Sequence, residues 1–441
     1  MIENLLTLNY EFKNPDQFIE TDPDLSKLKR YLLVNKSPLL EKFPTSTPGI
    51  YTLTGGGLVG KTTLLKQWIE ILLFKKNISA NQIYYYSANS ISNYHELITL
   101  IQTTLQTKNK YAINYIFLDD ITYIKDWEKS IKFLIDLGLL EHTILFLVSS
   151  DKLLRNKLIE LNIFNDIQNN NNHFHLYPLS FHETILLKHP HEEINFYDEF
   201  NQYLLHGGYL IAINNMASHH KILESTLKMY TDWMRKEIIN CGRQEIFSHD
   251  ILTAIINNYN KPITWNFLTK ELSINHPKTI GDYITLLESL DVLFVQFALT
   301  EKTLGKAPKK ARKTIFTDPF IFHSIKSWIN PINDPFETQI LPILKNSSWC
   351  TKLVMTTTTM HFSRFYPTYY IKDEGDIDLA YIFDNRFWPI LITWTNELNT
   401  KDLKQLLKYP NGKILTKSQK LSTIDHIRTE PLPLALWKIY D

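Results

Sequence analysis

The stretch GIYTLTGGGLVGKTTLLKQ at residues 49–67 decides the fold of this chain. An apolar run typical of a buried strand comes first, and a helical pattern begins at Lys61. Between them, residues 55–62 fit G-x-x-x-x-G-K-[ST], the pattern of a phosphate-binding loop or P-loop. In such a loop the glycines let backbone N–H groups surround phosphates, and the helix N-terminus favours their negative charge. The lysine reaches the outer phosphates, and the Thr62 hydroxyl ligates magnesium.

A strand directly before the loop and a helix directly after it make a chance match in a glycine-rich turn the weaker interpretation. We therefore predict that the chain binds ATP together with Mg2+. The predicted nucleotide-binding residues are Gly55, Gly56, Gly57, Leu58, Val59, Gly60, Lys61, Thr62 and Thr63.

An acidic motif follows at residues 114–120, where a second apolar run ends in Asp119 and Asp120. We expect Asp119 to complete the magnesium site with Thr62, and Asp120 to orient the attacking water. Lys61 is expected to act in catalysis as well. Ser149 ends another predicted strand, and it either senses the γ-phosphate or caps a helix; the pattern leaves both alternatives open.

Apolar runs and helical patterns alternate between residues 49 and 150. This alternation predicts an α/β fold, a doubly wound parallel sheet with helices on both faces. The run at residues 83–88 falls between the P-loop and the acidic motif in sequence, which is the arrangement of the additional-strand class of P-loop ATPases.

The length of 441 residues predicts two or three domains, because single cores stop growing near roughly 300 residues. We expect a P-loop domain over residues 1–190 and a helical domain over residues 191–330. Residues 263–299 within the latter have the order helix, turn, helix, strand, which is typical of a winged helix. Residues 331–441 alternate again and predict a third, α/β domain.

Composition narrows the range of partners. The chain has 47 basic and 46 acidic side chains, so no overall field draws it to nucleic acid or to an anionic membrane. Two cysteines, no export signal and no apolar run of spanning length favour a cytoplasmic protein. The histidines show no metal-site spacing, and we expect His173 with His175, and His189 with His191, to lie in loops and on the surface.

Together these motifs resemble a family of prokaryotic AAA-type P-loop ATPases fused to a winged helix and a C-terminal nuclease-like domain of unknown function. The resemblance runs nearly end to end. It is carried by residues 49–67, 116–136, 176–183, 206–213, 279–294 and 313–325.

The departures from the family pattern concern hydrolysis. The family has Pro-Arg where this chain has Gly56-Gly57, Asp-Glu where it has Asp119-Asp120, and Gly-Arg where it has the asparagine tract at residues 169–172. An arginine there would stabilise transition-state charge. Its loss and the shorter acid imply slow hydrolysis, with Arg155 as a candidate replacement.

The nuclease-like resemblance implies a helix glutamate, a strand aspartate and a Glu-x-Lys pair that together bind magnesium. Glu337 and Asp378 match the first two positions. Leu391 and Thr393 stand at the other two, so we expect an inactive nuclease-like domain.

The predicted recognition helix at residues 277–290 offers few side chains that read bases. The segment after it is basic, and its cations are Lys302, Lys306, Lys309, Lys310, Arg312 and Lys313. We predict that this wing contacts DNA phosphates; a solvated hairpin or a protein contact is the alternative. The sequence thus favours a slow, ATP-dependent switch acting on DNA, against a nucleotide-stabilised scaffold that binds DNA or protein. A protein client or self-association stays open, and no membrane partner is expected.

Overall fold

The computed structural model describes residues 12–106, 112–163, 172–189, 194–395 and 398–440. It divides into two compact units, Met1–Tyr177 with Ser289–Asp291, and Pro178–Glu288 with Val292–Asp441. The predicted boundary at residue 190 is therefore replaced by one after Tyr177, and the predicted second and third domains form a single unit.

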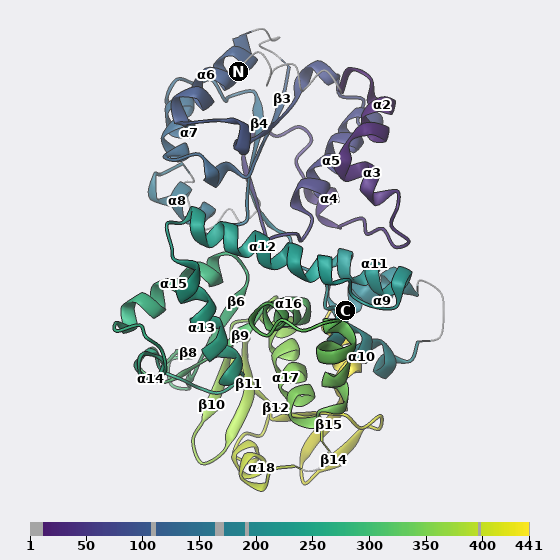
Figure 1. The fold of residues 1–441 in the computed structure, drawn as a ribbon, viewed down its shortest axis with the longest axis vertical. Helices are drawn as coiled ribbons and strands as arrows, with labels where there is room; N and C mark the ends of the chain where they lie inside the picture. The colour runs from purple at the N-terminus through teal and green to yellow at the C-terminus, as the bar shows by residue number, and fades with distance from the viewer. Residues whose placement is uncertain (1–11, 107–111, 164–171, 190–193, 396–397, 441) are drawn as a thin grey trace. The chain divides into compact units, whose positions relative to one another are not determined.

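The first unit is built on a five-stranded parallel sheet of order β2-β3-β4-β1-β5 (Figure 1). Its strands are β1 Gly49–Thr54, β2 Ile83–Ser87, β3 Asn114–Asp119, β4 Thr143–Ser149 and β5 His173–His175. This confirms the predicted α/β fold with a parallel sheet. Strand β4 lies between the P-loop strand β1 and the acidic strand β3, so the P-loop and Asp119 are on strands separated by one neighbour.

Helices cover both faces of this sheet (Figure 1). One face packs Leu118 and Leu147 against α6, α7 and α8, and the other packs Phe117 and Phe146 against α5 and the N-terminal helices. Every residue of β3 and β4 is buried, so successive side chains are covered on both faces, as a doubly covered sheet requires. The helices are α2 Pro15–Thr21, α3 Pro23–Leu28, α4 Leu39–Lys42, α5 Lys61–Phe74, α6 Tyr94–Gln106, α7 Trp127–Asp136 and α8 Leu154–Glu160.

The second unit begins with helices, followed by a short β ladder. Helices α14 and α15 precede strands β6 and β9, which pair antiparallel with Phe297 opposite Arg312. This order agrees with the predicted helix, turn, helix and strand. The elements are α9 Phe181–Lys188, α10 Phe196–His206, α11 Leu210–His219, α12 Glu224–Asn240, α13 Glu245–Asn257, α14 Trp265–Glu271, α15 Pro277–Ser289, β6 Leu293–Phe297, β7 Leu299–Thr300, β8 Gly305–Lys306, β9 Arg312–Phe316 and α16 Pro319–Ile329.

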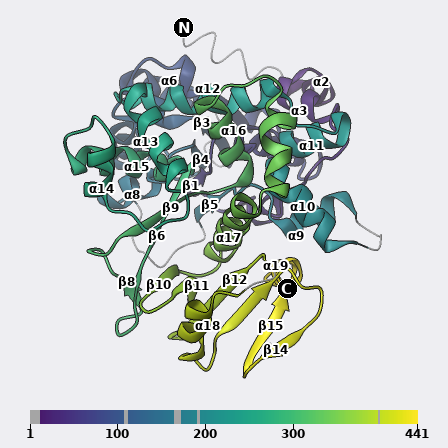
Figure 2. The same cartoon turned by 60° about the horizontal axis from the view of Figure 1, so that its bottom comes forward.

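A six-stranded mixed sheet of order β10-β11-β12-β13-β15-β14 forms the rest of this unit (Figure 2). Helix α18 covers it with Leu406, which packs among Leu391, Ile414 and other apolar side chains of the strands. The elements are α17 Ser347–Ser363, β10 Thr368–Lys372, β11 Asp376–Phe383, β12 Arg386–Thr393, α18 Thr400–Leu407, β13 Lys413–Thr416, β14 Ser422–Ile424, β15 Ile427–Pro431 and α19 Leu432–Lys438.

Three of the sequence motifs meet inside the second unit and explain why it is not two domains. Leu179 N–H donates to Gly208 O at 2.8 Å, and Gly208 N–H donates to Asp318 Oδ2 at 2.9 Å. A Cβ on Gly208 would lie 1.9 Å from Leu179 O, so only glycine fits. Phe181 N–H also donates to His361 Nε2 on α17 at 2.9 Å. The start of the unit is therefore bonded to α16 and α17, across the predicted boundary at residue 330.

No helix in the described ranges combines the length and the apolar character needed to cross a membrane.

Candidate nucleotide-binding site

The P-loop connects the end of β1 to the start of α5, and glycine is required at two of its positions. Gly55 has no room for a side chain, because a Cβ there would lie 2.4 Å from Leu176 O. Gly60 caps α5 with a φ of 108°, a left-handed conformation that other residues rarely adopt. The loop thus presents backbone N–H groups at a helix N-terminus, which suits an anionic ligand.

Lys61 points back into this loop. Its Nζ donates to Gly55 O at 2.8 Å, to Gly56 O at 2.9 Å and to Ser150 Oγ at 3.0 Å. The side chain is 7% exposed. The predicted phosphate-contacting cation therefore lies inside the loop and is bonded to the end of β4.

Thr62 and Asp119, the two predicted magnesium ligands, lie side by side. Thr62 Oγ1 donates to Asp119 Oδ2 at 2.7 Å. A hydroxyl and a carboxylate next to a phosphate-binding loop are oxygen ligands of the kind that Mg2+ takes together with substrate phosphates. The residues present therefore fit the ion that the P-loop implies.

Tyr85 is a member of this site that the sequence reasoning missed. Its hydroxyl donates to Asp119 Oδ2 at 2.7 Å. Burial, and then the charge of Asp119, raise the pKa of Tyr85, so the phenol stays protonated and keeps donating. Tyr85 thus holds the Asp119 carboxylate in place from the neighbouring strand β2.

A buried ion pair extends the site to the N-terminal helices. Lys66 Nζ lies 3.8 Å from the centroid of the Tyr85 ring and 2.9 Å from Asp22 Oδ2. Asp22 in turn accepts the N–H groups of Asp24 and Leu25 at the start of α3. Lys66 follows Thr62 by one helical turn, so the i, i+4 spacing could have placed it beside the site; Asp22 has no such signal.

The two remaining predicted catalytic residues differ in their surroundings. Asp120 follows β3 with a φ of 55°, and its N–H donates to Asp119 Oδ1 at 3.1 Å. Ser149 is fully buried, accepts the Asp151 N–H at 2.9 Å and lies 2.9 Å from Thr122 Oγ1. The bond to Asp151 closes a local turn and does not cap a helix, because α8 begins at Leu154 and its N-cap Leu153 has no side-chain capping bond. Ser150, the next residue, is the serine that contacts Lys61. The catalytic roles of Asp120 and Ser149 stay predictions.

The expectation that His173 and His175 lie in a surface loop is wrong, because both belong to β5. Their Nδ1 atoms lie 2.6 Å and 2.8 Å from the hydroxyls of Thr52 and Thr54 on β1. Burial first, and then His175 and Arg155, lower the pKa of His173 to about 4. These polar pairs let two histidines stand in the sheet. His189 contacts Glu199 at 3.0 Å, and His191 lies outside the described residues.

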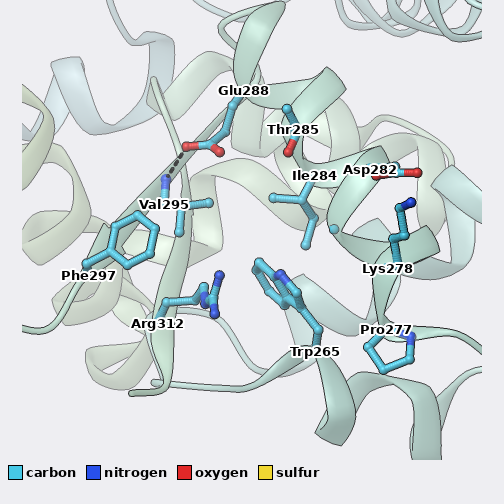
Figure 3. A pocket seen from close by; sticks show the side chains of 11 residues that line it. Trp265, Pro277, Lys278, Asp282, Ile284, Thr285, Glu288, Val295, Phe297 and Arg312 are labelled. Carbon is cyan, nitrogen blue, oxygen red and sulfur yellow. Dashed lines mark hydrogen bonds between the residues drawn. The ribbon is translucent and has the colours of Figure 1, made fainter. Parts of the chain in front are cut away.

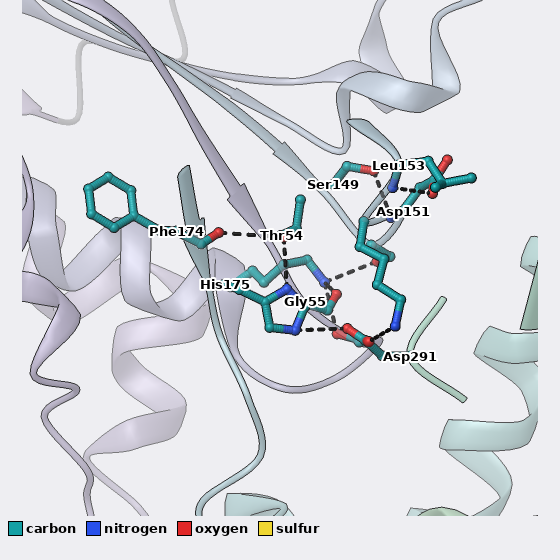
Figure 4. Close-up of polar contacts among 12 residues, drawn as sticks. Thr54, Gly55, Ser149, Asp151, Leu153, Phe174, His175 and Asp291 are labelled. Atoms are coloured by element: carbon teal, nitrogen blue, oxygen red, sulfur yellow. Dashed lines mark hydrogen bonds and ion pairs between the residues drawn. The ribbon is translucent and has the colours of Figure 1, made fainter. Parts of the chain in front are cut away.

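Asp291 completes a polar network beside the P-loop (Figure 4). Its Oδ2 lies 3.1 Å from His175 Nε2, and its Oδ1 accepts Lys152 Nζ at 2.8 Å. The Lys152 N–H also donates to Ser289 O at 2.9 Å. Burial alone would raise the pKa of Asp291, but His175 and Lys152 lower it to about 2. The short segment Ser289–Asp291 is thereby held in the first unit.

The asparagine tract that stands where the family has an arginine, and the candidate replacement Arg155, can be placed only in part. Residues 169–171 of the asparagine tract lie outside the described residues. Arg155 is on α8, where its charge contributes to the low pKa of His173. Its predicted part in hydrolysis stays a prediction.

The predicted wing is basic at its tip but not along its whole length. Lys302, Lys306, Lys309 and Lys310 are exposed. Lys313 is 5% exposed and lies 3.7 Å from Asp378 Oδ1, so the expectation that it contacts DNA is corrected. As the alternating side chains of β9 require, its neighbour Arg312 points to the other face.

The predicted nuclease positions do not assemble into a metal site. Glu337 is exposed in the π-helical segment Phe336–Ile340 and not at the start of the long helix α17. Asp378 is buried, with Lys313 on one oxygen and the Ile392 N–H on the other at 3.3 Å. Over the described ranges, no group of three or more His, Cys, Asp or Glu residues is placed to hold a metal ion.

Comparison with known proteins identifies the nucleotide-binding region. Residues 47–185 match the sequence model of the AAA domain. The chain carries an AAA domain. This domain spans the P-loop, Asp119 and Ser149, and members of its family generally use ATP and Mg2+. No curated protein gives a match.

Two of the solved structures that match belong to archaeal proteins. One is the ORC1 protein of Aeropyrum pernix in complex with DNA, with 13% identity, a TM-score of 0.33 and coverage of 75% of this chain and 98% of that one. The other is CDC6P of Pyrobaculum aerophilum, with 13% identity, a TM-score of 0.29 and coverage of 69% and 98%. TM-scores this low do not establish a shared overall fold.

Proposed function

We propose that this protein is a slow ATPase that works as a nucleotide-dependent switch, with a winged helix that binds DNA and a nuclease-like region that is inactive. ATP binding is supported by the P-loop of an AAA domain, in which Thr62 Oγ1 donates a hydrogen bond to Asp119. When bound, Mg2+ would neutralise phosphate charge at Thr62 and Asp119. Lys61 would contact the outer phosphates, and Tyr85 would keep the Asp119 carboxylate oriented.

The switch is supported by the bonds of the loop that follows β4. Ser150 in this loop accepts a hydrogen bond from Lys61, and Lys152 bonds both Ser289 and Asp291. Phosphates compete with Ser150 for Lys61, so ATP and ADP would hold this loop differently. Ser289 is the last residue of α15, and the loop could therefore pass the nucleotide state to that helix.

Slow hydrolysis and an inactive nuclease-like region follow from side chains that are missing. Asp120 is shorter than the glutamate of related ATPases, and the arginine before residues 178–181 is replaced. In the C-terminal sheet, Leu391 and Thr393 provide neither the acid nor the lysine, and Asp378 is engaged by Lys313. A cytoplasmic location is part of the same proposal.

The first prediction tests ATP binding. Lys61→Ala should weaken ATP binding by at least tenfold, because charge-assisted hydrogen bonds to phosphate contribute roughly 1.5–3 kcal/mol. Isothermal titration calorimetry measures the affinity, and Lys76→Ala, at an exposed lysine just after the end of α5, is the matched control. Equal ATP affinity in wild type and a folded Lys61→Ala variant would refute the central proposal.

The second prediction tests the switch. ATP should change amide hydrogen exchange of residues 277–289 relative to ADP, and Asp291→Asn should reduce that difference when both proteins are saturated with nucleotide. Asp384→Asn is the matched control, since Asp384 is an exposed aspartate with a similar φ of 51°. If ATP, ADP and nucleotide-free protein show the same exchange and the same DNA affinity, the nucleotide is structural and the protein is a scaffold.

A further inference from the structure

The second unit contains a pocket of about 430 Å³ between α14, α15 and the β6/β9 ladder (Figure 3). A volume of this size falls in the range of small-ligand sites, roughly 300–1,000 Å³. Its lining combines aromatic, cationic and acidic side chains, chiefly Trp265, Ile284, Thr285, Glu288, Phe297 and Arg312. None of these belongs to the nucleotide-binding site.

Cations and aromatic rings alternate along one wall of this pocket. The Arg312 guanidinium carbon lies 4.7 Å from the Trp265 ring centroid and 5.4 Å from that of Phe297. Lys306 Nζ lies 5.5 Å from the Phe297 ring. Lys306 is one of the exposed lysines of the wing, so the basic wing tip and the pocket wall are continuous.

Arg312 is fixed in position but keeps an unused donor. Its backbone N–H donates to Ile263 O at 2.9 Å, and its Nη2 donates to Pro308 O at 3.2 Å. Its Nε is buried and makes no hydrogen bond to any residue in the described ranges. Because this Nε is buried, a ligand in the pocket would contact the accessible part of the guanidinium group and not this donor.

The acidic side chains of the pocket, Glu288 and Asp282, determine which chemical groups of a ligand it can accept. Glu288 lines the pocket opposite Arg312, and its Oε1 accepts the Val295 N–H at 3.0 Å (Figure 3). Asp282 lines the same pocket. A phosphate would be repelled by these carboxylates, whereas a base can donate its amino groups to them. Phosphates are attracted instead to the lysines outside the pocket.

We propose that this pocket takes an unpaired base of a single-stranded nucleic acid, while Lys302, Lys306, Lys309 and Lys310 contact the flanking phosphates. The inference deepens the nucleic-acid part of the proposed function and rests on it. A base stacked inside a duplex cannot enter a recessed pocket, whereas aromatic and arginine planes accept bases of any sequence. Duplex DNA would find on α15 only Lys278 as a cation among the pocket residues, next to Asp282.

The test compares nucleic acids of equal length by fluorescence anisotropy with the full chain. The probes are a labelled strand of about 16 nucleotides in DNA and in RNA form, the DNA strand with abasic sites, and its duplex, all at roughly 50 mM salt. Single strands should bind about tenfold more tightly than the duplex and the abasic strand. The DNA and RNA arms identify which nucleic acid is preferred.

Two variants separate stacking from charge. Arg312→Lys keeps the charge but loses the planar group, and should weaken binding of the intact strand about tenfold with little effect on the abasic strand. Arg235→Lys is the matched control, because Arg235 lies 5.9 Å from the Trp328 ring on other helices. Charge reversal at Lys309 and Lys310 should weaken every probe, and thermal unfolding checks that each variant folds.

Equal affinities for the intact and abasic strands, or tighter binding of the duplex, would overturn the inference. Absence of all nucleic-acid binding would overturn it as well. ATP affinity measured on the same samples keeps this outcome distinct, because only its loss would count against the proposed ATPase.

Discussion

At the scale of single residues, the backbone conformation at Asp120 suits aspartate, whereas the predicted water-orienting role suits the longer glutamate. A water-orienting carboxylate must come within hydrogen-bond reach of the attacking oxygen, and a displacement of about 1 Å can cost about a hundredfold in rate. Asp120→Glu should therefore raise single-turnover hydrolysis. It should also lower stability by about 1 kcal/mol, since aspartate tolerates the left-handed φ of 55° better than glutamate.

Asp119→Ala is the companion to that experiment and should abolish magnesium-dependent turnover. Should wild type already turn over at an ordinary ATPase rate and Asp120→Glu slow it, the site is adapted to aspartate and the slow-switch proposal fails.

Some residues of the nucleotide-binding site can be predicted from the sequence and others cannot. Lys61, Thr62 and Asp119 were found from motif spacing, whereas Asp22 and Tyr85 join the site only through contacts between distant elements.

At the scale of elements, replacing two glycines by alanine should change stability in opposite directions. Gly208→Ala would place a Cβ 1.9 Å from Leu179 O and should destabilise the second unit by more than about 3 kcal/mol. Gly281→Ala on α15 meets only Trp265 atoms at 3.5 Å, an ordinary contact, and should stabilise the helix by roughly 0.5–1 kcal/mol. Chemical denaturation of both variants measures the difference. Similar stabilities for the two would contradict the packing described around Leu179.

The sheet of the first unit shows why some elements were predictable and others were not. The run at residues 49–54 became β1 with the same bounds, because a long apolar run before a P-loop has few alternatives. Strand β5 is only His173–His175, and its two polar residues are compatible with a sheet only because Thr52 and Thr54 face them. That pairing is set by tertiary structure and leaves no local pattern. The same is true of Lys313, whose partner Asp378 is distant in sequence.

At the scale of the whole molecule, acid should weaken the second unit. Burial is the main cause that lowers the pKa of His206 and His361 to about 3 and that of His323 to about 4. Because the unfolded chain binds these protons first, their stabilisation is complete above pH 6.5 and is lost as pH falls toward the folded values. At pH 5 each of the three histidines lowers the free energy of unfolding by up to about 2 kcal/mol. Burial raises the pKa of Asp318 to about 6, so this residue acts in the opposite direction. At pH 5 its protonation raises the free energy of unfolding by only about 1 kcal/mol.

Hydrogen exchange at pH 7 and pH 5, corrected for the intrinsic rate, would measure this effect. Protection should fall in α10, α16 and α17, which contain the three histidines. Helix α5 contains no histidine and is the internal control. Unchanged protection in α17 at pH 5 would mean that His361 is not held neutral by burial.

The placement of Ser289–Asp291 in the first unit has a practical consequence for anyone who dissects this protein. The chain leaves that unit after Tyr177, returns for three residues and leaves again. A fragment that ends at Tyr177 keeps every nucleotide-binding motif, yet it removes the acid that pairs with Lys152 and His175. Lys152 would then lose its counter-ion and His175 its carboxylate partner, beside Thr54 and the P-loop. Kinetic constants from such a truncated ATPase would describe an altered active site, so only the intact polypeptide is a valid reference for its enzymology.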